Sequence, residues 1–232
     1  MLTHRRRHEL NRFLIAIDGP AGSGKSSVAK LVAQKMNMNY LDTGAMYRAV
    51  ALYLHSKGLS AKDDLKKHLA EIDIEYIDGE LYLNKKKVSD EIRSSEAGKL
   101  ASDFATIPAV RERLTQIQRH ICQNGKFVVE GRDIGTVVLP EADVKIFLTA
   151  SFKERVRRRF EELKAKNMNL TMEDIADQIK IRDRQDSSRS IAPLKPAEDA
   201  IVIDTTSKDI NEVADEICQI AFRRIKVEDN CC

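Results

Sequence analysis

The segment FLIAIDGPAGSGKSSVAKLV, residues 13–32, decides the fold class of this chain. Its first five residues form a continuous apolar run, which is typical of a strand buried on both faces of a parallel sheet. Apolar side chains then recur at helical spacing over residues 26–36, and residues 39–41 form a second short strand segment. A strand, a loop, a helix and a second strand in this order predict an α/β fold.

The loop between this strand and this helix matches the pattern G-x-x-x-x-G-K-[ST] at every fixed position. Its glycines let backbone N–H groups approach phosphate oxygens, and the N-terminus of the following helix favours negative charge. The pattern predicts that Lys25 reaches the β- and γ-phosphates of a bound nucleotide and that Ser26 binds Mg²⁺. A purely structural glycine-rich turn is the other interpretation, and the Lys25-Ser26 pair disfavours it. The predicted nucleotide-binding residues are Gly19, Pro20, Ala21, Gly22, Ser23, Gly24, Lys25, Ser26 and Ser27.

Further apolar runs and helical patterns extend this unit along the chain. Three more buried strands are expected at residues 127–129, 144–148 and 200–204, which makes five strands in one parallel sheet. Helices are expected on both faces of that sheet, so the predicted architecture has three layers. The other helical segments are residues 46–54, 95–105, 108–122 and 153–166, a segment opened by a capping box at 171–174, and residues 210–225.

One region has a different pattern. Apolar and polar residues alternate on either side of Asp78-Gly79, which predicts a β-hairpin, and residues 85–88 can add a third short strand. We therefore expect a small antiparallel insert in the α/β fold. The predicted division is a core of residues 13–62 and 94–226, an insert of residues 63–93, a disordered basic tail of residues 1–12 and a second tail of residues 227–232.

Composition limits the function classes. Of the 232 residues, 42% are hydrophobic and 32% charged, so one globular domain is expected rather than disorder or a fibrous repeat. The net charge of +3 is too small for a general nucleic-acid binder. The four cysteines contain no C-x-x-C pair, which disfavours a zinc site and favours a reducing compartment. No apolar run has the length of a membrane span and no secretory signal opens the chain, so a cytoplasmic protein is expected.

Arginines stand where a second anionic substrate would need them. Arg132 follows a predicted strand, at the end where open α/β sheets bind ligands. Arg182, Asp186 and Arg189 are spaced to share one face of a predicted helix. A single surface arginine is usually a solvated charge, but several guanidinium groups together suit phosphoryl transfer between two anions.

Other classes of nucleotide-binding protein fit the sequence less well. A switch GTPase needs a guanine-reading N-K-x-D element, and none follows the loop. Motor and transporter ATPases place an acid at a strand end for Mg²⁺, as Glu130 could be, but Arg132-Asp133 directly after it is unusual for them. The alternatives that stay open are a kinase of UMP, AMP or a hydroxyl metabolite, and an NTP-dependent regulatory or nucleic-acid-binding protein that uses the cluster Arg5-Arg6-Arg7.

Four sequence blocks are specific when taken together. They are IDGPAGSGKS at residues 17–26, LDTGAMYR at 41–48, EGRDIGTVV at 130–138, and RDRQD at 182–186 with RSIAPL at 189–194. With these blocks the chain resembles the bacterial-type cytidylate kinases, nucleoside monophosphate kinases with the P-loop NTPase fold. The second and third blocks are specific in combination, and the resemblance runs from about residue 13 to residue 225. It implies an enlarged monophosphate-binding region around the insert and a short helical lid near residues 153–190.

The resemblance also implies a role for each matching residue. The implied acceptor site consists of Thr43, Arg48 and Arg132 around the nucleotide and its phosphate, Ser102, Arg111, Asp133 and Arg189 at the base, and Arg182 and Asp186 at the ribose. The lid is expected to cover the donor ATP through Arg158 and Arg159. The implied catalytic residues are Lys25, Arg132, Arg158 and Arg182.

The activity that the resemblance implies is transfer of the γ-phosphate of ATP to CMP or dCMP, giving ADP and CDP or dCDP, in pyrimidine nucleotide metabolism. Direct in-line transfer needs no general base, because a phosphate monoester is largely dianionic near neutral pH (second pKa about 6). Cytosine offers an N4 amino donor to the Asp133 carboxylate, whereas uracil would oppose its O4 to the same group. The expected partners are ATP and CMP or dCMP, with Mg²⁺ as cofactor. We expect a monomer that binds neither nucleic acid nor membranes.

Overall fold

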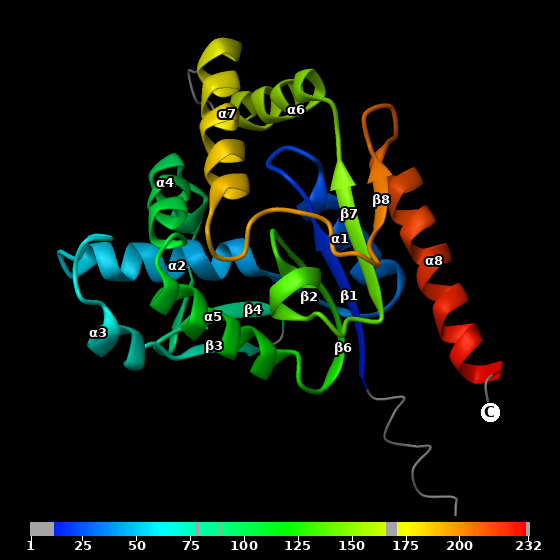
Figure 1. Ribbon diagram of the computed structural model, residues 1–232, viewed down its shortest axis with the longest axis horizontal. Coiled ribbons are helices and arrows are strands. Elements are labelled where there is room, and N and C mark those ends of the chain that lie inside the picture. The colour runs from blue at the N-terminus through cyan, green and yellow to red at the C-terminus, as the bar shows by residue number, and fades with distance from the viewer. Residues whose placement is uncertain (1–11, 78, 89, 166–170, 231–232) are drawn as a thin grey trace, which may run out of the picture. The chain divides into compact units, whose positions relative to one another are not determined.

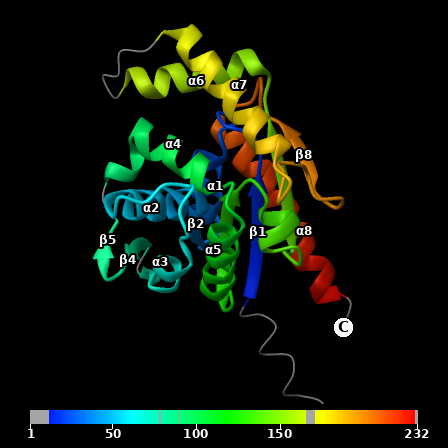
Figure 2. The ribbon, with the colours of Figure 1, turned by 60° about the vertical axis from the view of Figure 1, so that its left-hand side comes forward.

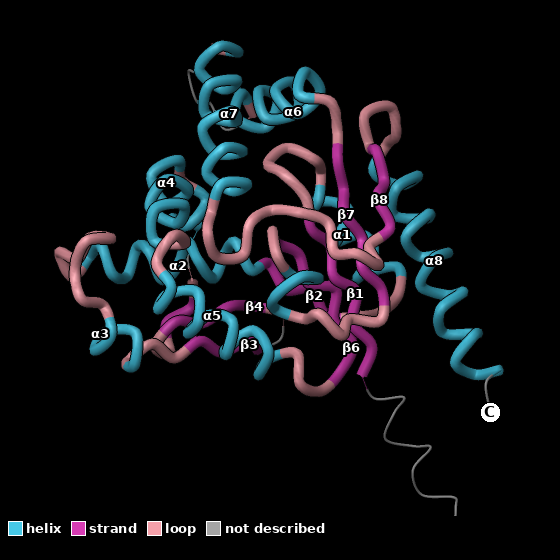
Figure 3. Tube along the Cα trace, viewed as in Figure 1, coloured by secondary structure: helices cyan, strands magenta, loops and turns pink. Residues whose placement is uncertain are grey.

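The computed structural model describes residues 12–77, 79–88, 90–165 and 171–230 (Figure 1). The chain forms two compact units, and helices and strands alternate along both (Figure 3). Of the described residues, the sheet unit contains those in 13–40 and 127–230, and the hairpin unit contains those in 41–126 together with Arg12. The division predicted from the sequence stays a prediction. The basic tail lies outside the described residues except for Arg12, which begins a strand.

A five-stranded sheet runs through the sheet unit. Its strands are β1 (Arg12–Asp18), β2 (Asn39–Asp42), β6 (Gly125–Gly131), β7 (Val144–Thr149) and β8 (Ile201–Asp204), in the spatial order β2-β6-β1-β7-β8. β1 pairs in parallel with β7, with Ile15 opposite Val144, and β7 pairs in parallel with β8. The five-stranded parallel sheet predicted from the apolar runs is confirmed.

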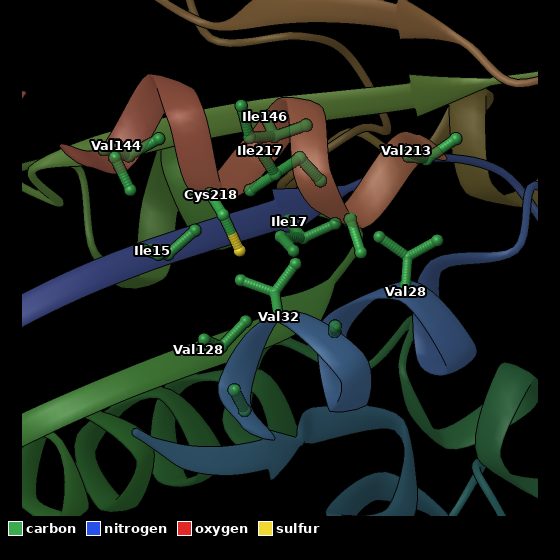
Figure 4. Packing of buried hydrophobic residues seen from close by; sticks show 14 of the residues in the cluster. Ile15, Ile17, Val28, Val32, Val128, Val144, Ile146, Val213, Ile217 and Cys218 are labelled. Atoms are coloured by element: carbon green, nitrogen blue, oxygen red, sulfur yellow. The ribbon is translucent and has the colours of Figure 1, made fainter. Parts of the chain in front are cut away.

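One face of this sheet packs on α1 (Lys25–Lys35) and α8 (Ile210–Asn230), which also contact each other. Ile15 and Ile17 of β1 point toward these helices and meet Val32 and Ile217 in a buried cluster (Figure 4). Leu14 of the same strand points the other way and is also fully buried. A strand buried on both faces explains why its sequence is apolar throughout. α8 continues past residue 225, where the sequence pattern had placed its end.

Two further helices of the sheet unit, α6 (Phe152–Lys164) and α7 (Met172–Ser188), pack side by side (Figure 2). Their contact is a small apolar cluster of Val156, Leu163, Ile175 and Ile179. Thr171 and Asp174 form the predicted capping box at the start of α7. Residues 166–170, which include the predicted end of the first helix, lie outside the described residues. A short π-helical turn, η3 (Ile134–Val138), follows β6 and was not predicted.

The hairpin unit contains the predicted antiparallel sheet. Ile74 pairs with Leu83 across the hairpin, and Gly79 has φ +82° at its turn, a conformation that favours glycine. Asp78 lies outside the described residues. The elements of this unit are α2 (Thr43–Ser56), α3 (Lys66–Ala70), β3 (Ile74–Ile77), β4 (Glu80–Leu83), β5 (Lys86–Lys87), η2 (Asp90–Arg93), α4 (Ser95–Phe104) and α5 (Pro108–Ile121).

α2 begins earlier than the sequence pattern predicted. The sequence pattern predicts a strand over residues 39–41 and a helix that starts only at Met46. Instead Asp42 is the N-cap of α2, and its Oδ1 accepts the Ala45 N–H at 2.8 Å. An aspartate cap satisfies one of the N–H groups that a helix start leaves unpaired, so the first turn forms over Thr43 and Gly44.

Candidate functional site

The loop between β1 and α1 has a backbone that glycine alone adopts easily. At Gly19, with φ +150°, a Cβ would lie 2.1 Å from the Leu148 carbonyl oxygen. Gly24, with φ +88°, is the N-cap of α1 and offers no side chain to cap the helix. The first amides of α1 therefore depend on an external acceptor, at the end of the helix that carries partial positive charge. This geometry suits a phosphate group.

Lys25 is buried at this helix start, with 6% of its surface exposed. Its Nζ donates to the Pro20 carbonyl oxygen at 2.7 Å and to Ser23 Oγ at 3.4 Å, so the side chain lies back along the loop. Burial and the nearby guanidinium groups of Arg132 and Arg182 lower the pKa of the Lys25 ammonium well below its usual value. A polyanion bound in the loop would supply the missing negative charge.

Ser26 and Glu130 connect the helix start to the end of β6. The Ser26 Oγ donates to Glu130 Oε2 at 3.0 Å, and the Tyr40 hydroxyl donates to the other oxygen of the same carboxylate. Glu130 is 3% exposed. A hydroxyl that donates its proton to a buried carboxylate is a better ligand for a hard cation. The Ser26–Glu130 pair therefore fits the oxygen ligands that Mg²⁺ prefers.

Asp18, the last residue of β1, holds the turn that follows β6. Its two carboxylate oxygens accept the N–H groups of Ile134 at 2.9 Å and Gly135 at 2.8 Å. Burial raises the pKa of Asp18 to about 6, although the two backbone donors work in the opposite direction. Asp133, directly before this turn, is itself buried. Asp18 thus fixes the backbone beside a residue that the sequence resemblance assigns to the base.

Asp186 is the centre of an arginine cluster. It is 1% exposed and accepts a hydrogen bond from Arg132 Nε at 2.8 Å. Arg189 also pairs with Asp186, and Arg182 Nε lies 4.0 Å from the same carboxylate. The sequence spacing had placed Arg189 on the helix face of Arg182 and Asp186, and this is wrong in detail. Arg189 is the C-cap of α7 with extended backbone, yet its side chain turns back to Asp186.

The two lid arginines have different surroundings. Arg158 donates to the Thr205 carbonyl oxygen at 2.6 Å and to Glu154 Oε1 at 2.7 Å, and its Nη1 lies 3.5 Å from the Ser23 carbonyl oxygen of the loop. Arg159 instead pairs with Glu162 of its own helix on the surface. Arg158 is therefore beside the phosphate-binding loop, whereas the contact of Arg159 with a nucleotide stays a prediction.

Four predicted acceptor residues lie in the hairpin unit. Thr43 is buried at the first position of α2, and Arg48 pairs with Asp42 at 3.0 Å one turn later. Arg111 is 5% exposed, donates to the Ala105 carbonyl oxygen at 3.3 Å and lies 5.6 Å from the ring centre of Tyr47. Ser102 is half-buried on α4. α2 contacts both α4 and α5, so these four residues come from helices that pack together.

The sheet unit gathers the loop and the remaining predicted residues. The Lys25 ammonium experiences the charges of Arg132 and Arg182, and Arg132 is bonded to Asp186. The predicted site residues that belong to this unit are Gly19, Pro20, Ala21, Gly22, Ser23, Gly24, Lys25, Ser26, Ser27, Arg132, Asp133, Arg158, Arg182, Asp186 and Arg189.

Three residues of this region were not predicted as site residues. Glu130 has the position of a strand-end acid, but the Arg132-Asp133 pair after it disfavoured the ATPase classes in which such an acid serves Mg²⁺. Asp18 directly precedes the loop and lies in the first sequence block, but the resemblance gave it no role. Arg155 of α6 donates to the Ala21 carbonyl oxygen at 3.1 Å, and no sequence block pointed to it. None of the helices in the described part of the chain is long and apolar enough to cross a membrane.

Comparison with known proteins agrees with this geometry. The model of the family described as cytidylate kinase matches residues 15–223. The chain belongs to the cytidylate kinase family. It is 57% identical over 215 residues to the cytidylate kinase of Fervidobacterium nodosum, and the match covers 92% of this chain and 98% of that protein. It is 53% identical over 217 residues to the cytidylate kinase of Thermotoga neapolitana, with 92% and 99% of the two chains covered.

Among solved structures, this cytidylate kinase family member is similar to an uncharacterized protein from Eubacterium ventriosum. The TM-score is 0.50 at 14% identity, and the match covers 90% of this chain and 98% of that one. At this identity the likeness concerns the fold alone. The family match over nearly the whole described core and the phosphate-binding loop both identify the chain as a phosphotransferase, as the sequence blocks predicted.

Proposed function

We propose that this protein transfers the γ-phosphate of ATP to CMP or dCMP and releases ADP with CDP or dCDP. The observation that carries the proposal is the charge arrangement of the sheet unit. The phosphate-binding loop and the Asp186 cluster lie in one unit, and the Lys25 ammonium experiences the charges of Arg132 and Arg182. A lysine and several guanidinium groups beside the phosphate-binding loop suit two bound phosphate groups.

The donor side of the reaction rests on the loop and on α1. Backbone amides from Gly22 to Ser27 and the Lys25 ammonium would bind the β- and γ-phosphates of ATP. Ser26, backed by Glu130, would hold a magnesium ion, whose chemistry there is to neutralise charge on the donor phosphates. Arg158, which already lies against the loop carbonyl of Ser23, would cover the nucleotide from α6.

The acceptor side rests on the arginines. Arg132, bonded to Asp186, would contact the phosphate of CMP and the group in transfer. Arg182, whose Nε lies 4.0 Å from the same carboxylate, would act on the group in transfer and, with Asp186, on the ribose. An α-phosphate oxygen of CMP attacks the γ-phosphorus in line, and the bond from that phosphorus to the β,γ-bridging oxygen of ATP breaks, so ADP leaves. No side chain has to remove a proton, because the acceptor phosphate is already mostly dianionic at neutral pH. The protein contributes positioning and charge neutralisation.

Base selection would come from Asp133 with Ser102, Arg111 and Arg189. A carboxylate accepts from the N4 amino group of cytosine, and hydroxyl and guanidinium donors suit its O2 and N3. The burial of Asp133 supports this role, since O4 of uracil would oppose one acceptor to another in a water-poor environment. Thr43 and Arg48 would hold the acceptor nucleotide from the hairpin unit.

The test is a coupled assay of ADP formation with Mg-ATP and each of CMP, dCMP, UMP, AMP or no acceptor. We expect fast ADP formation with CMP, slower formation with UMP, and almost none without an acceptor. ADP formation that does not depend on a monophosphate would show an ATPase instead. Equal rates with UMP or AMP would contradict the role given to Asp133.

The proposal extends to the oligomeric state of the protein, its compartment and its binding of nucleic acid. We expect a monomer, which sedimentation analysis at several protein concentrations tests directly. We also expect that the enzyme acts in the cytoplasm and binds no nucleic acid. The free thiols of Cys122 and Cys218, both buried in the apolar interior, are compatible with a reducing compartment. Binding of the protein to DNA that weakens as the salt concentration rises would contradict the expectation that it binds no nucleic acid.

A further inference from the structure

Arg155 is a buried cation that was not among the predicted site residues. It stands in the first turns of α6, four residues after Ser151, the N-cap of that helix. The residue is 8% exposed, and its guanidinium lies 5.6 Å from the ring centre of Phe152. Burying an arginine is costly unless its donors are satisfied, so the partners of this side chain indicate its role.

The first partner of Arg155 is the phosphate-binding loop. Its Nη1 donates to the Ala21 carbonyl oxygen at 3.1 Å. The backbone of Arg155 also lies close to the backbone of the loop. A Cβ on Gly22 would lie 2.9 Å from the Arg155 carbonyl oxygen and 3.0 Å from the Arg155 Cβ. Glycine at position 22 thus permits the start of α6 to pack directly on the loop that is expected to bind ATP.

The second partner of Arg155 is α7. Nη1 donates to Asp183 Oδ1 at 3.0 Å, and Nη2 lies 2.7 Å from Asp183 Oδ2. This two-point contact fixes orientation as well as distance, because the guanidinium fork matches the carboxylate. The pair is well shielded, with side-chain exposures of 9% and 26%. Asp183 lies between Arg182 and Asp186 on α7, the residues at the centre of the proposed acceptor contacts.

We propose that Arg155 is a positioning residue that couples the donor loop to α7 through Asp183. This coupling rests on the proposed function, since the two coupled sites are those of ATP and CMP. When ATP binds, it fixes the conformation of the loop and so the position of the Ala21 carbonyl. Arg155 is bonded to this carbonyl and to Asp183, so the position of α7 becomes fixed as well. Arg182 and Asp186 lie on the same helix and are positioned with it. The enzyme then binds the acceptor more tightly when the donor site is filled, and the reverse must hold to the same extent.

The test measures this coupling directly. The dissociation constant of CMP is determined by calorimetry for the full-length protein with and without Mg-AMP-PNP, an ATP analogue that does not react. In the wild type we expect CMP to bind more tightly with the analogue, by about fivefold or more. Asp183→Asn, which keeps the size of the side chain and the Arg155–Ala21 contact, should bring this ratio close to one. Arg155→Met should do the same.

The double variant distinguishes coupling from general damage. Arg155→Met with Asp183→Asn should lose no more coupling than either change alone, because both remove one link. Two matched controls lie on the same helices in exposed ion pairs. They are Arg157→Met, whose partners are Glu154 and Glu161, and Asp177→Asn, whose partner is Lys180. Both controls should keep the wild-type ratio.

The outcomes separate the inference from the proposed function. A wild-type protein without CMP-dependent ADP formation contradicts the function itself. A wild-type enzyme that transfers phosphate but shows no coupling, or whose coupling survives Asp183→Asn, overturns the role of Arg155. Additive losses in the double variant would overturn it as well, since they would indicate two separate structural effects. If Arg155→Met does not fold, Arg155→Lys replaces it. Lysine keeps the positive charge but cannot make the two-point contact with Asp183, so the ratio of the CMP dissociation constants should fall toward one.

Discussion

The hydroxyl of Ser26 donates a hydrogen bond to the carboxylate of Glu130 at 3.0 Å, although the two residues come from different elements of the sheet unit. Ser26 lies in the first turn of α1, and Glu130 lies near the end of β6. The contact places a buried negative charge directly behind the proposed magnesium ligand. Glu130 therefore belongs to the site even though it need not touch the nucleotide.

Glu130→Gln should weaken magnesium use. The amide keeps the size of the side chain and can still accept from Ser26, but it removes the negative charge. We expect the Mg²⁺ concentration for half-maximal activity to rise by about 10-fold or more, as for other residues behind a metal ligand. A magnesium titration at fixed ATP measures it. Tyr40→Phe is the matched control because it removes a donor to Glu130 and leaves the charge. An equal rise in both variants would contradict the assignment.

Lys25→Ala should abolish transfer without harming the fold. The ammonium is buried and its pKa is lowered by burial and by two arginines, so it destabilises the nucleotide-free protein. We expect kcat/KM to fall by about 100-fold or more, while the thermal midpoint stays the same or rises. Turnover near the wild-type rate would disprove the function given to the loop. Lys35→Ala, which removes an exposed ion pair at the other end of the same helix, is the control and should be active.

Asp133→Ala should lower the selection of CMP over UMP. The carboxylate is buried and would accept the N4 amino group, so its loss removes a bond to cytosine and a repulsion from uracil. We expect kcat/KM for CMP to fall by about 10-fold or more, and that for UMP to fall much less. Steady-state kinetics with both acceptors at saturating ATP measures this. Equal losses for the two substrates would indicate that Asp133 acts only on the structure of the turn.

Asp18 should make stability depend on pH in the weakly acidic range. Its carboxyl has a pKa of about 6 in the folded protein against 3.8 in the unfolded chain. The folded state therefore holds the proton longer, and stability is lost as the pH rises from about 4 through about 6. Asp18→Asn does not titrate. Its stability relative to the wild type should improve by about 1 kcal/mol between about pH 5 and pH 7.

Urea unfolding at these two pH values tests the prediction for Asp18. A matched exposed position is Asp63, whose pKa is lowered by hydrogen bonds from Ser60. The change Asp63→Asn should therefore show no such improvement between the two pH values. A constant difference between wild type and Asp18→Asn at both pH values would show that Asp18 does not titrate in this window.

Local patterns predicted the elements well and the residues that meet across the fold less well. The apolar run of β1 and the alternation around the hairpin depend on which side chains are buried, and burial leaves a period in the sequence. The start of α2 and the conformation of Arg189 depend on single hydrogen bonds to Asp42 and Asp186. Such bonds compete with helical spacing and leave no period, so the sequence pattern missed them.

The sequence by itself determined the phosphate-binding loop, because the loop is one contiguous pattern whose glycines, Gly19 and Gly24, adopt backbone angles that favour glycine. It also determined the five-stranded parallel sheet, because strands buried on both faces are apolar throughout. It also determined the family through blocks that are each contiguous in the chain. Only the tertiary structure decided that Glu130 stands behind Ser26 and that Arg155 joins Ala21 to Asp183. These partners are far apart in the sequence, and a charged residue at a strand end or on a helix has many possible partners until the fold selects one.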